Sequence, residues 1–344
     1  MTYDSIAILI PAYKPDERLV TLVKALKAKG FSRVVTVDDG GGEAFRPIFD
    51  QLQGLCTVLV HPQNRGKGAA LKTGLSYLMT TDAQGVVTAD ADGQHTPEDC
   101  ARIAEALLRD PEALILGSRS KKQMPPRSKF GNTCTCVAFF LSTFHWIHDT
   151  QTGLRGIPRS RMEACAHLEG DRYEYELNML LYACHEKMTV TEVEIKTIYI
   201  DDNASSHFHP IRDGARIYGL LFRQGIKYAA SSLIAFLVDW VCFALLSWAG
   251  LAIGAAQLCA RVVSSLVNYF INREVVFQGD RRPVTIVKYY ILAVFVFLGT
   301  WGLTEGLVRI GVTKLVAQPI ASLIMFFASY PLQKKFVFPP RKKG

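Results

Sequence analysis

Residues 88–95 read Thr-Ala-Asp-Ala-Asp-Gly-Gln-His. An apolar run at residues 85–87 leads into it, and Pro97 opens a helical pattern just after it. Asp90 and Asp92 therefore stand where a buried strand ends, the edge at which open α/β sheets bind ligands. Two carboxylates one residue apart could chelate Mg²⁺ or Mn²⁺ together with ligand phosphates. Taken alone, such a pair is more often a solvated turn that caps the next helix.

Apolar runs and helical patterns alternate on both sides of this stretch. Short apolar runs predict strands at residues 5–10, 34–37, 56–60, 85–89, 113–116 and 190–200. Helical spacing separates the earlier runs near residues 16–29, 43–52, 66–80 and 97–109. This alternation predicts an α/β domain with a mostly parallel sheet and helices on both faces.

Polar chemistry follows each of the first strands. The segments concerned are Pro11-Ala12-Tyr13, Asp38-Asp39 and Asn64-Arg65-Gly66-Lys67-Gly68. Backbone N–H groups at a helix start, with a lysine beside them, suit a pyrophosphate. The spacing is neither that of a Walker A loop nor that of a Gly-x-Gly-x-x-Gly fingerprint. Each motif alone is common turn chemistry, whereas their placement at one sheet edge indicates a binding site.

Taken in order, these motifs resemble those of family 2 glycosyltransferases. The resemblance covers roughly residues 3–215 and is strongest to the dolichol-phosphate mannose synthase and bactoprenol glucosyltransferase branch. It rests on Ile10-Pro11-Ala12-Tyr13, Val37-Asp38-Asp39-Gly40, Asn64-Arg65-Gly66-Lys67-Gly68, Asp90-Ala91-Asp92-Gly93-Gln94-His95 and Gly117-Ser118-Arg119. It implies a GT-A fold, a nucleotide-sugar donor, Mg²⁺ or Mn²⁺ as cofactor, and inversion at the anomeric carbon.

The resemblance also implies roles for individual residues. It implies a metal site at Asp90, Asp92 and Gln94, and nucleotide-sugar contacts at Pro11, Ala12, Tyr13, Asp38, Asp39, Asn64, Lys67, Asp90 and Ala91. The sequence departs from the family pattern after Asp39, where Gly-Gly replaces Gly-Ser, and around Lys14, where the family has a glutamate. The base of the nucleotide therefore stays open.

The second half of the domain is expected to hold the acceptor. Cations suited to a lipid phosphate are Arg119, Arg127, Lys129 and Arg155, and His207 and Arg212 are candidates for a loop over the donor. A solvated basic loop is the alternative for these residues. The predicted catalytic residues are Asp92, Arg119 and Asp149. Asp149 is assigned to positioning because a phosphate nucleophile is already ionised near neutral pH and needs no strong base.

An aromatic segment, residues 130–146, follows the predicted acceptor cations. Its apolar residues recur at a spacing that fits a helix lying on a bilayer surface, and a core helix is an equal alternative.

Composition points to a membrane rather than to nucleic acid. The chain has 344 residues, 49% of them hydrophobic, a net charge of +8 and a mean hydropathy of +0.15. Because residues 226–336 are mostly apolar, the positive charge suits an anionic membrane face. The eight cysteines have no zinc spacing and suit reduced thiols, and Asp4 argues against a cleavable signal peptide.

Four apolar segments predict an all-α membrane domain. They lie near residues 227–249, 252–273, 286–308 and 314–334, each about the ~20 residues needed to span a bilayer. Basic residues flank one side, so the positive-inside rule places both termini and the catalytic domain in the cytoplasm. Asp239 and Arg261 are expected to pair, or to line a polar path for a lipid head group, whereas Glu305 has no evident partner.

This region resembles the GtrA family, whose members are proposed to flip or present polyprenyl-linked sugars. The resemblance rests on Asn268-Tyr269-Phe270-Ile271-Asn272-Arg273 and Val275-Val276-Phe277. The predicted domains are 1–210 (glycosyltransferase), 211–225 (amphipathic linker), 226–338 (membrane) and 339–344 (basic tail).

The combined prediction is a multi-pass membrane glycosyltransferase that moves a hexose from a UDP- or GDP-sugar to a polyprenyl phosphate, such as undecaprenyl phosphate, for cell-envelope glycans. A lipid-linked sugar transporter and a transferase with another lipid or glycan acceptor are the alternatives. The sugar, the base and a homo-oligomeric state are left open.

Overall fold

The computed structural model describes residues 3–120, 124–196, 198, 210–277 and 282–338. The chain divides into two compact units, Met1–Leu221 and Phe222–Gly344. Each unit has its own core, and each is described by itself.

A mixed sheet forms the centre of the first unit. Within the described residues it has seven strands in the order β3-β2-β1-β4-β6-β5-β7. The neighbouring strands pair in parallel except where β6 runs antiparallel to β4 and β5, so the predicted mostly parallel sheet is confirmed. The strands are β1 (Ile6–Ala12), β2 (Arg33–Asp38), β3 (Thr57–Val60), β4 (Gly85–Thr88), β5 (Leu114–Arg119), β6 (Arg155–Pro158) and β7 (Val190–Ile195).

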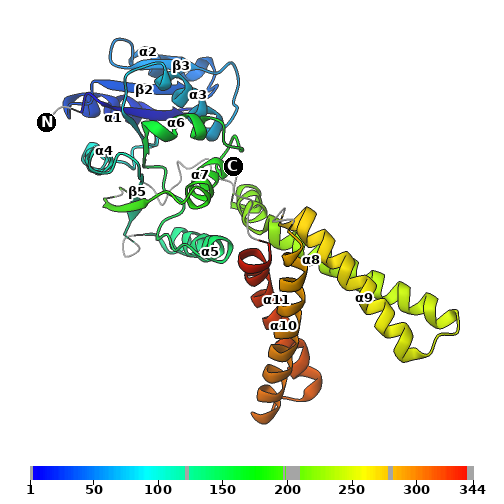
Figure 1. Cartoon of the computed structure of the whole chain (residues 1–344). Helices are drawn as coiled ribbons and strands as arrows, with labels where there is room; N and C mark the ends of the chain where they lie inside the picture. Colours follow the sequence, from blue (N-terminus) through cyan, green and yellow to red (C-terminus); the bar gives the residue numbers. More distant parts are fainter. Residues whose placement is uncertain (1–2, 121–123, 197, 199–209, 278–281, 339–344) are drawn as a thin grey trace. The chain divides into compact units, whose positions relative to one another are not determined.

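Helices cover both faces of this sheet (Figure 1). Alternate residues of β1 enter opposite cores: Ile8 packs with one set of helices and Leu9 with the other. The first face carries α1 (Glu17–Ala28), α2 (Arg46–Asp50), which follows the short η1 (Glu43–Phe45), and α4 (Pro97–Arg109). The second carries α3 (Lys67–Met79), α5 (Pro126–Thr143), α6 (Arg159–Ala166) and α7 (Glu174–His185).

Local chemistry sets where these helices begin. Asp16 caps α1 by accepting a hydrogen bond from the backbone N–H of Arg18, and Thr96 caps α4 by accepting from the backbone N–H of Asp99. Pro97 occupies the first turn of α4, where its missing N–H leaves no bond unmade. The observed bounds of both helices therefore lie within two residues of the predicted ones.

The strand register brings the polar segments to one edge of the sheet. Ala12 pairs with Asp38 at the ends of β1 and β2, and Thr88 at the end of β4 pairs with Arg155 at the start of β6. β6 is not predicted from the sequence, because a four-residue antiparallel strand has little periodicity of its own.

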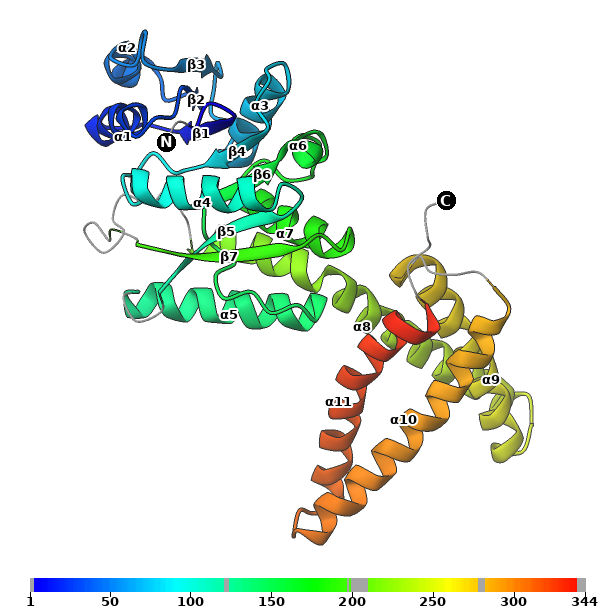
Figure 2. The same ribbon diagram turned by 60° about the vertical axis from the view of Figure 1, so that its left-hand side comes forward.

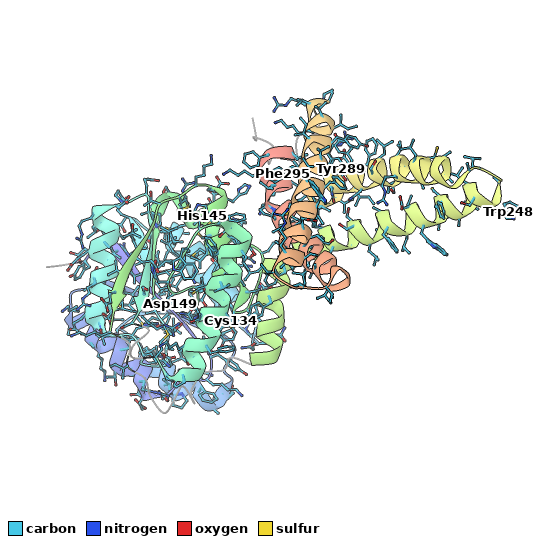
Figure 3. All side chains as sticks on the ribbon, turned by 90° about the horizontal axis from the view of Figure 1, so that it is seen from below. Cys134, His145, Asp149, Trp248, Tyr289 and Phe295 are labelled. Atoms are coloured by element: carbon cyan, nitrogen blue, oxygen red, sulfur yellow. The ribbon has the colours of Figure 1, made fainter. Side chains whose placement is uncertain are left out.

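The second unit consists of helical hairpins (Figure 2). Its helices are α8 (Pro210–Trp248), which begins in the first unit, α9 (Ile253–Ile271), α10 (Val284–Arg309) and α11 (Lys314–Leu332). The π-helical turns η3 (Asn272–Val276) and η4 (Gln333–Val337) follow α9 and α11. Among the described residues, Leu221–Trp248 and Val284–Arg309 are long and apolar enough to cross a bilayer. Trp248, where α8 ends, lies at the tip of the first hairpin (Figure 3).

The two hairpins repeat each other with an offset of 61 residues. Gly250 and Gly311 end the first helix of each copy with positive φ angles of 86° and 96°. The π-helical turns η3 and η4 follow at the same offset. Other identical pairs are Lys227/Lys288, Tyr228/Tyr289, Phe236/Phe297, Leu237/Leu298, Trp240/Trp301, Leu246/Leu307, Ala256/Ala317, Gln257/Gln318, Ala260/Ala321, Tyr269/Tyr330, Val276/Val337 and Phe277/Phe338.

The contacts between the hairpins repeat as well. Ring centroids are 5.5 Å apart in each of the pairs Tyr228–Tyr330, Tyr269–Tyr289 and Phe277–Phe338. The offset of 61 residues relates the first pair to the second, and it relates the two members of the third pair to each other. The side-chain amide of Asn272 donates to Oε1 of Gln333 at 3.1 Å, again between equivalent positions. The hairpins therefore meet in a locally two-fold aromatic cluster with a polar centre.

The side chains of Asp239 and Glu305 each lie near a cation. Asp239 lies 3.6 Å from Arg261 and accepts a hydrogen bond from Ser264 at 2.9 Å, so the predicted pairing is confirmed. The expectation that Glu305 lacks a partner is wrong, since Arg309 lies one turn further along α10 at 3.8 Å.

Candidate active site

The carboxylate of Asp90 is the centre of a charged cluster at the end of β4. Its Oδ1 atom lies 2.6 Å from the Lys67 ammonium, and its Oδ2 atom lies 3.4 Å from Nε2 of the buried His95. Gly153 approaches from the start of β6, where a Cβ would stand 2.3 Å from Oδ2. The Gly153 carbonyl accepts a hydrogen bond from Thr88 at 2.7 Å, which ties this segment to the end of β4. Asp90 is therefore held on three sides.

Lys67 connects Asp90 to a second acid, Glu176. The Glu176 Oε1 atom lies 2.9 Å from the ammonium, and its side chain is only 9% exposed. Glu176 is not predicted as a site residue from the sequence. The one sequence feature that marks it is its position in the first turn of a helix, where an acid usually only interacts favourably with the helix dipole.

Close packing of α3 on the start of α7 brings Lys67 and Glu176 together. A Cβ on Gly68 would stand 2.5 Å from Cβ of Tyr175, so a larger residue would separate the helices. The backbone N–H of Ala69 donates to the carbonyl of Asp171 at 3.0 Å. The protein therefore uses one of the N–H groups at this helix start for its own packing.

Burial and neighbouring charges shift the pKa values in this cluster. Burial opposes the charge on Lys67, but the carboxylates of Asp90 and Glu176 outweigh it and raise the pKa of the ammonium. Burial also opposes the charge on Asp90, and the Lys67 ammonium and His95 outweigh it and lower the pKa of that carboxyl. For Asp92, burial and the Asp90 carboxylate both raise the pKa. A nearby cation would therefore stabilise the ionised carboxylate of Asp92 more than that of Asp90.

The donors around Asp92 fit a hard divalent cation. Asp92 and Asp90 offer carboxylate oxygens, and Gln94, which is 8% exposed, follows within two residues. The backbone N–H of Gln94 donates to Oδ1 of Asp92 at 3.0 Å and orients it. In the described part of the chain, no group of three or more His, Cys, Asp or Glu side chains is arranged around a metal position. A cation here would depend on ligand phosphates for further oxygens, as Mg²⁺ sites commonly do.

Asp39 is buried and holds the loop that follows β3. Its Oδ1 atom accepts a hydrogen bond from the backbone N–H of Arg65 at 2.9 Å and contacts Nδ1 of His61 at 2.8 Å. Its Oδ2 atom accepts from the backbone N–H of Gly66 at 2.8 Å and from the Asn64 amide at 3.0 Å. The side chains of Asp39 and Asn64 thus bind each other and fix the shape of this loop.

The other residues predicted to bind the nucleotide gather beside this loop. The carbonyl of Ala12 accepts a hydrogen bond from the backbone N–H of Asp39 at 2.8 Å, which joins the ends of β1 and β2. Pro11 is buried with Ala12, whereas Tyr13 and Asp38 are half-buried and reach the surface. Ala91, between the two metal-site acids, is half-buried as well.

Asp149 and Arg119 form one buried ion pair. Nε of Arg119, at the end of β5, donates to Oδ2 of Asp149 at 2.6 Å, and Nη2 donates to Oδ1 at 3.0 Å. Asp149 is fully buried, and the backbone N–H of Gln151 donates to the same Oδ1 atom at 3.1 Å. Figure 3 shows Asp149 inside the first unit. In this geometry Asp149 orients Arg119, and a bidentate pair of this kind is strongly directional.

Arg155 does not lie where a phosphate ligand is expected. Its guanidinium is 1% exposed and donates to the carbonyls of Thr152 at 3.0 Å, Thr150 at 3.5 Å and Glu176. The prediction of an acceptor contact is therefore corrected: Arg155 fastens the segment before β6 to the first turn of α7.

The remaining predicted acceptor and donor-loop residues are only partly described. Lys129 is exposed on α5. The side chains of Arg127 and Arg212, and the whole of His207, lie outside the described residues.

Helix α5 has one buried and one exposed apolar face. Phe139 and Cys136 are fully buried against the sheet, whereas Phe130 is 73% exposed and Leu141 is 53% exposed. Trp146, just beyond the helix, is 47% exposed. Each of the two predicted roles, core helix and interfacial helix, therefore fits one face.

Comparisons with known proteins point in the same direction for both units. The model of the family "Glycosyl transferase family 2" matches residues 7–171, and that of "GtrA/DPMS, transmembrane domain" matches residues 227–338. UDP-N-acetylglucosamine–dolichyl-phosphate N-acetylglucosaminyltransferase of Methanococcus voltae is 31% identical over 57% of this chain and 86% of its own length. Polyprenol monophosphomannose synthase of Mycolicibacterium smegmatis is 28% identical over 55% of this chain and 75% of its own length.

Among solved structures, glucosyl-3-phosphoglycerate synthase of Mycobacterium tuberculosis, in complex with Mn²⁺, UDP and phosphoglyceric acid, aligns with a TM-score of 0.49 and 14% identity. The alignment covers 65% of this chain and 76% of that one.

Proposed function

The chain belongs to glycosyl transferase family 2 and carries a GtrA/DPMS transmembrane domain, and from this premise we propose that it transfers a hexose from a UDP- or GDP-sugar to a polyprenyl phosphate. The observation that carries the proposal is the cluster of Lys67, Asp90 and Asp92 at the strand edge. An ammonium beside two acids, one of which gains from a cation, suits a metal-bound diphosphate. The membrane domain keeps a lipid acceptor close by and raises its effective concentration.

Asp90, Asp92 and Gln94 would hold Mg²⁺ or Mn²⁺, which supplies positive charge to the diphosphate that leaves. Lys67 adds a second positive charge to that diphosphate. Arg119, oriented by Asp149, and Lys129 attract the acceptor phosphate. An oxygen of the acceptor phosphate attacks the anomeric carbon from the face opposite the leaving group, so an α-linked donor gives a β-linked product. No side chain has to remove a proton, because the attacking phosphate is already ionised.

The location follows from the membrane domain and the charge distribution. The basic residues on one side of the four predicted spans support a cytoplasmic location for both termini and the catalytic domain. In that compartment nucleotide sugars are at hand, and the product serves cell-envelope glycan synthesis.

The test is a product assay on the full chain in detergent. It would receive undecaprenyl phosphate, Mn²⁺ or Mg²⁺, and a panel of UDP- and GDP-sugars, with mass spectrometry to detect a lipid-phosphate hexose. One donor is expected to give a metal-dependent product, and Asp92→Asn is expected to remove it. Asp4→Asn is the matched control, because Asp4 is exposed and precedes the opposite end of β1.

Absence of product with every donor, despite metal-dependent nucleotide binding, would overturn the polyprenyl-phosphate acceptor. It would favour another acceptor or the transporter alternative.

A further inference from the structure

Lys67 is held by two carboxylates where one would balance its charge. Asp90 lies 2.6 Å from the ammonium and Glu176 lies 2.9 Å from it. Both Lys67 and Glu176 are largely buried, with side chains 18% and 9% exposed. Oε1 of Glu176 is the atom that contacts the Lys67 ammonium, so this contact offsets part of the charge of the carboxylate.

The second carboxylate is unfavourable unless it has a use. Burying a charge is expensive, and an extra negative charge beside a diphosphate site repels the ligand. The carboxylate of Glu176 also favours the charge of the buried Arg155, whereas its direct contact, at 2.9 Å, is with Lys67. The arrangement makes sense where Asp90 has to release its hold on Lys67.

On the basis of the proposed function, we infer that Glu176 is a positioning residue that keeps Lys67 in place when Asp90 binds the metal. Asp90 cannot give its full charge both to a divalent cation and to the ammonium. Glu176 takes over as the partner of Lys67, so Lys67 stays ordered and turns its remaining N–H donors to the diphosphate. Lys67 and the metal then act together, instead of competing for Asp90.

The structure fixes Glu176 firmly enough for this role. The guanidinium of Arg155 donates to its backbone carbonyl. The close contact of Gly68 with Tyr175 sets the distance between α3 and α7. The position of the carboxylate is therefore set by the fold and not by the ligand, which is the condition for pre-organisation.

The test is a double-mutant cycle on nucleotide binding, measured with the full chain in detergent by titration calorimetry. The probes are UDP and GDP, each over a range of MnCl₂ concentrations, with the four proteins wild type, Lys67→Met, Glu176→Gln and the double variant. Glu176→Gln is expected to raise the half-saturating Mn²⁺ concentration, and the nucleotide Kd, by about tenfold. In the Lys67→Met background the same change is expected to alter the Kd by less than about twofold.

Glu174→Gln is the matched control, because Glu174 lies in the same first turn of α7. Its Oε1 atom accepts hydrogen bonds from the backbone N–H groups of Asp171 and Arg172, which glutamine can also satisfy. It is expected to leave both quantities unchanged. If Glu176→Gln does not fold, Glu176→Asp replaces it in the cycle, with a smaller increase of the same kind.

The outcomes separate the inference from the proposed function. Equal effects of the Glu176 change with and without Lys67, or an unchanged Mn²⁺ dependence, would overturn the inference while the enzyme still binds a nucleotide. A wild-type protein that binds neither UDP nor GDP with Mn²⁺ would overturn the proposed function as well.

Discussion

Asp90 and Asp92 stand two positions apart, yet their surroundings shift the pKa values of the two carboxyl groups in opposite directions. Burial acts to raise the pKa of Asp90, but Lys67 and His95 outweigh it and lower that pKa. For Asp92, burial and the Asp90 carboxylate both raise the pKa. The sequence shows that the two acids follow a strand, and this much was predictable from residues 85–95. It does not show which acid is already paired, because the partner Lys67 lies at the start of another helix.

The raised pKa of Asp92 predicts that stabilisation by metal depends on pH. Without metal, the protonated form of Asp92 is favoured in the folded state, so its contribution to stability is lost as the pH rises through the folded pKa. Mn²⁺ needs the carboxylate and has to displace that proton at low pH. The rise in Tm on adding Mn²⁺ is therefore expected to grow as the pH rises through the pKa of Asp92.

The measurement is thermal unfolding of the full chain in detergent, with EDTA or MnCl₂, at several pH values. Asp92→Asn should show almost no Mn²⁺ effect at any of them. A Tm shift that is independent of pH in the wild type would contradict the assignment of Asp92 as a ligand.

Gly153→Ala is predicted to displace the Asp90 carboxylate. The new Cβ would stand 2.3 Å from Oδ2, so the carboxylate has to move by a substantial fraction of an ångström. A misplacement of about 1 Å costs about a hundredfold in rate, and overpacking costs about 1–3 kcal/mol of stability. The measurement is kcat/KM of hexose transfer together with Tm.

Gly131→Ala is the control for this substitution. Gly131 lies within α5, and a Cβ there would meet no atom within 4 Å, so no loss of stability is expected. Equal activity of Gly153→Ala and the wild type would show that the close approach of Gly153 to Asp90 has no part in catalysis.

At the scale of the elements, strands with continuous apolar runs were predictable, and β6, which lacks such a run, was not. β1, β2 and β4 lie within two residues of their predicted bounds. β6 was missed because its four residues pair antiparallel between two other strands, a contact that local sequence does not encode. Glu176 was missed for the same reason, since the pairing with Lys67 arises from the packing of α3 on α7.

Helix α5 is predicted to touch the bilayer with its exposed apolar face. Phe130, Leu141 and Trp146 expose large apolar side chains, which suit the boundary between head groups and acyl chains. In the full chain reconstituted into vesicles, brominated lipids should quench the fluorescence of Trp146. Trp146→Phe identifies its share of the signal, and an identical quenching profile in that variant would rule out this contact.

At the scale of the whole molecule, the helices of the two hairpins were predictable, but the repeat that relates the hairpins was not. The four apolar segments were evident from hydropathy, but the 61-residue repeat was hidden among many similar apolar residues. The structure reveals it through features that composition does not show, such as the positive φ angles of Gly250 and Gly311 and the matching π-helical turns.

The polar centre between the hairpins is predicted to hold them together. Asn272 donates to Gln333 at 3.1 Å and accepts from Ser231 at 2.7 Å, and hydrogen bonds between membrane helices are worth about 0.6 kcal/mol and up to about 1.7 kcal/mol each. Asn272→Leu and Gln333→Leu should each lower resistance to unfolding by SDS, and the double variant should lose less than the sum of the two.

Thr304→Val is the control, because its hydroxyl bonds to the carbonyl of Thr300 within α10. Strictly additive losses in the double variant would show that Asn272 and Gln333 act separately.

The repeated hairpin also bears on how this chain could have arisen. Two copies related by a local two-fold axis are what a self-associating hairpin would leave after duplication and fusion of its gene. A homodimer must change both copies at once, whereas a fused pair can change one. The charged pair Asp239 and Arg261 occupies one hairpin only, since Thr300 and Ser322 stand at the equivalent positions of the other. A fused pair can hold such a difference between its copies, whereas a homodimer of identical hairpins cannot.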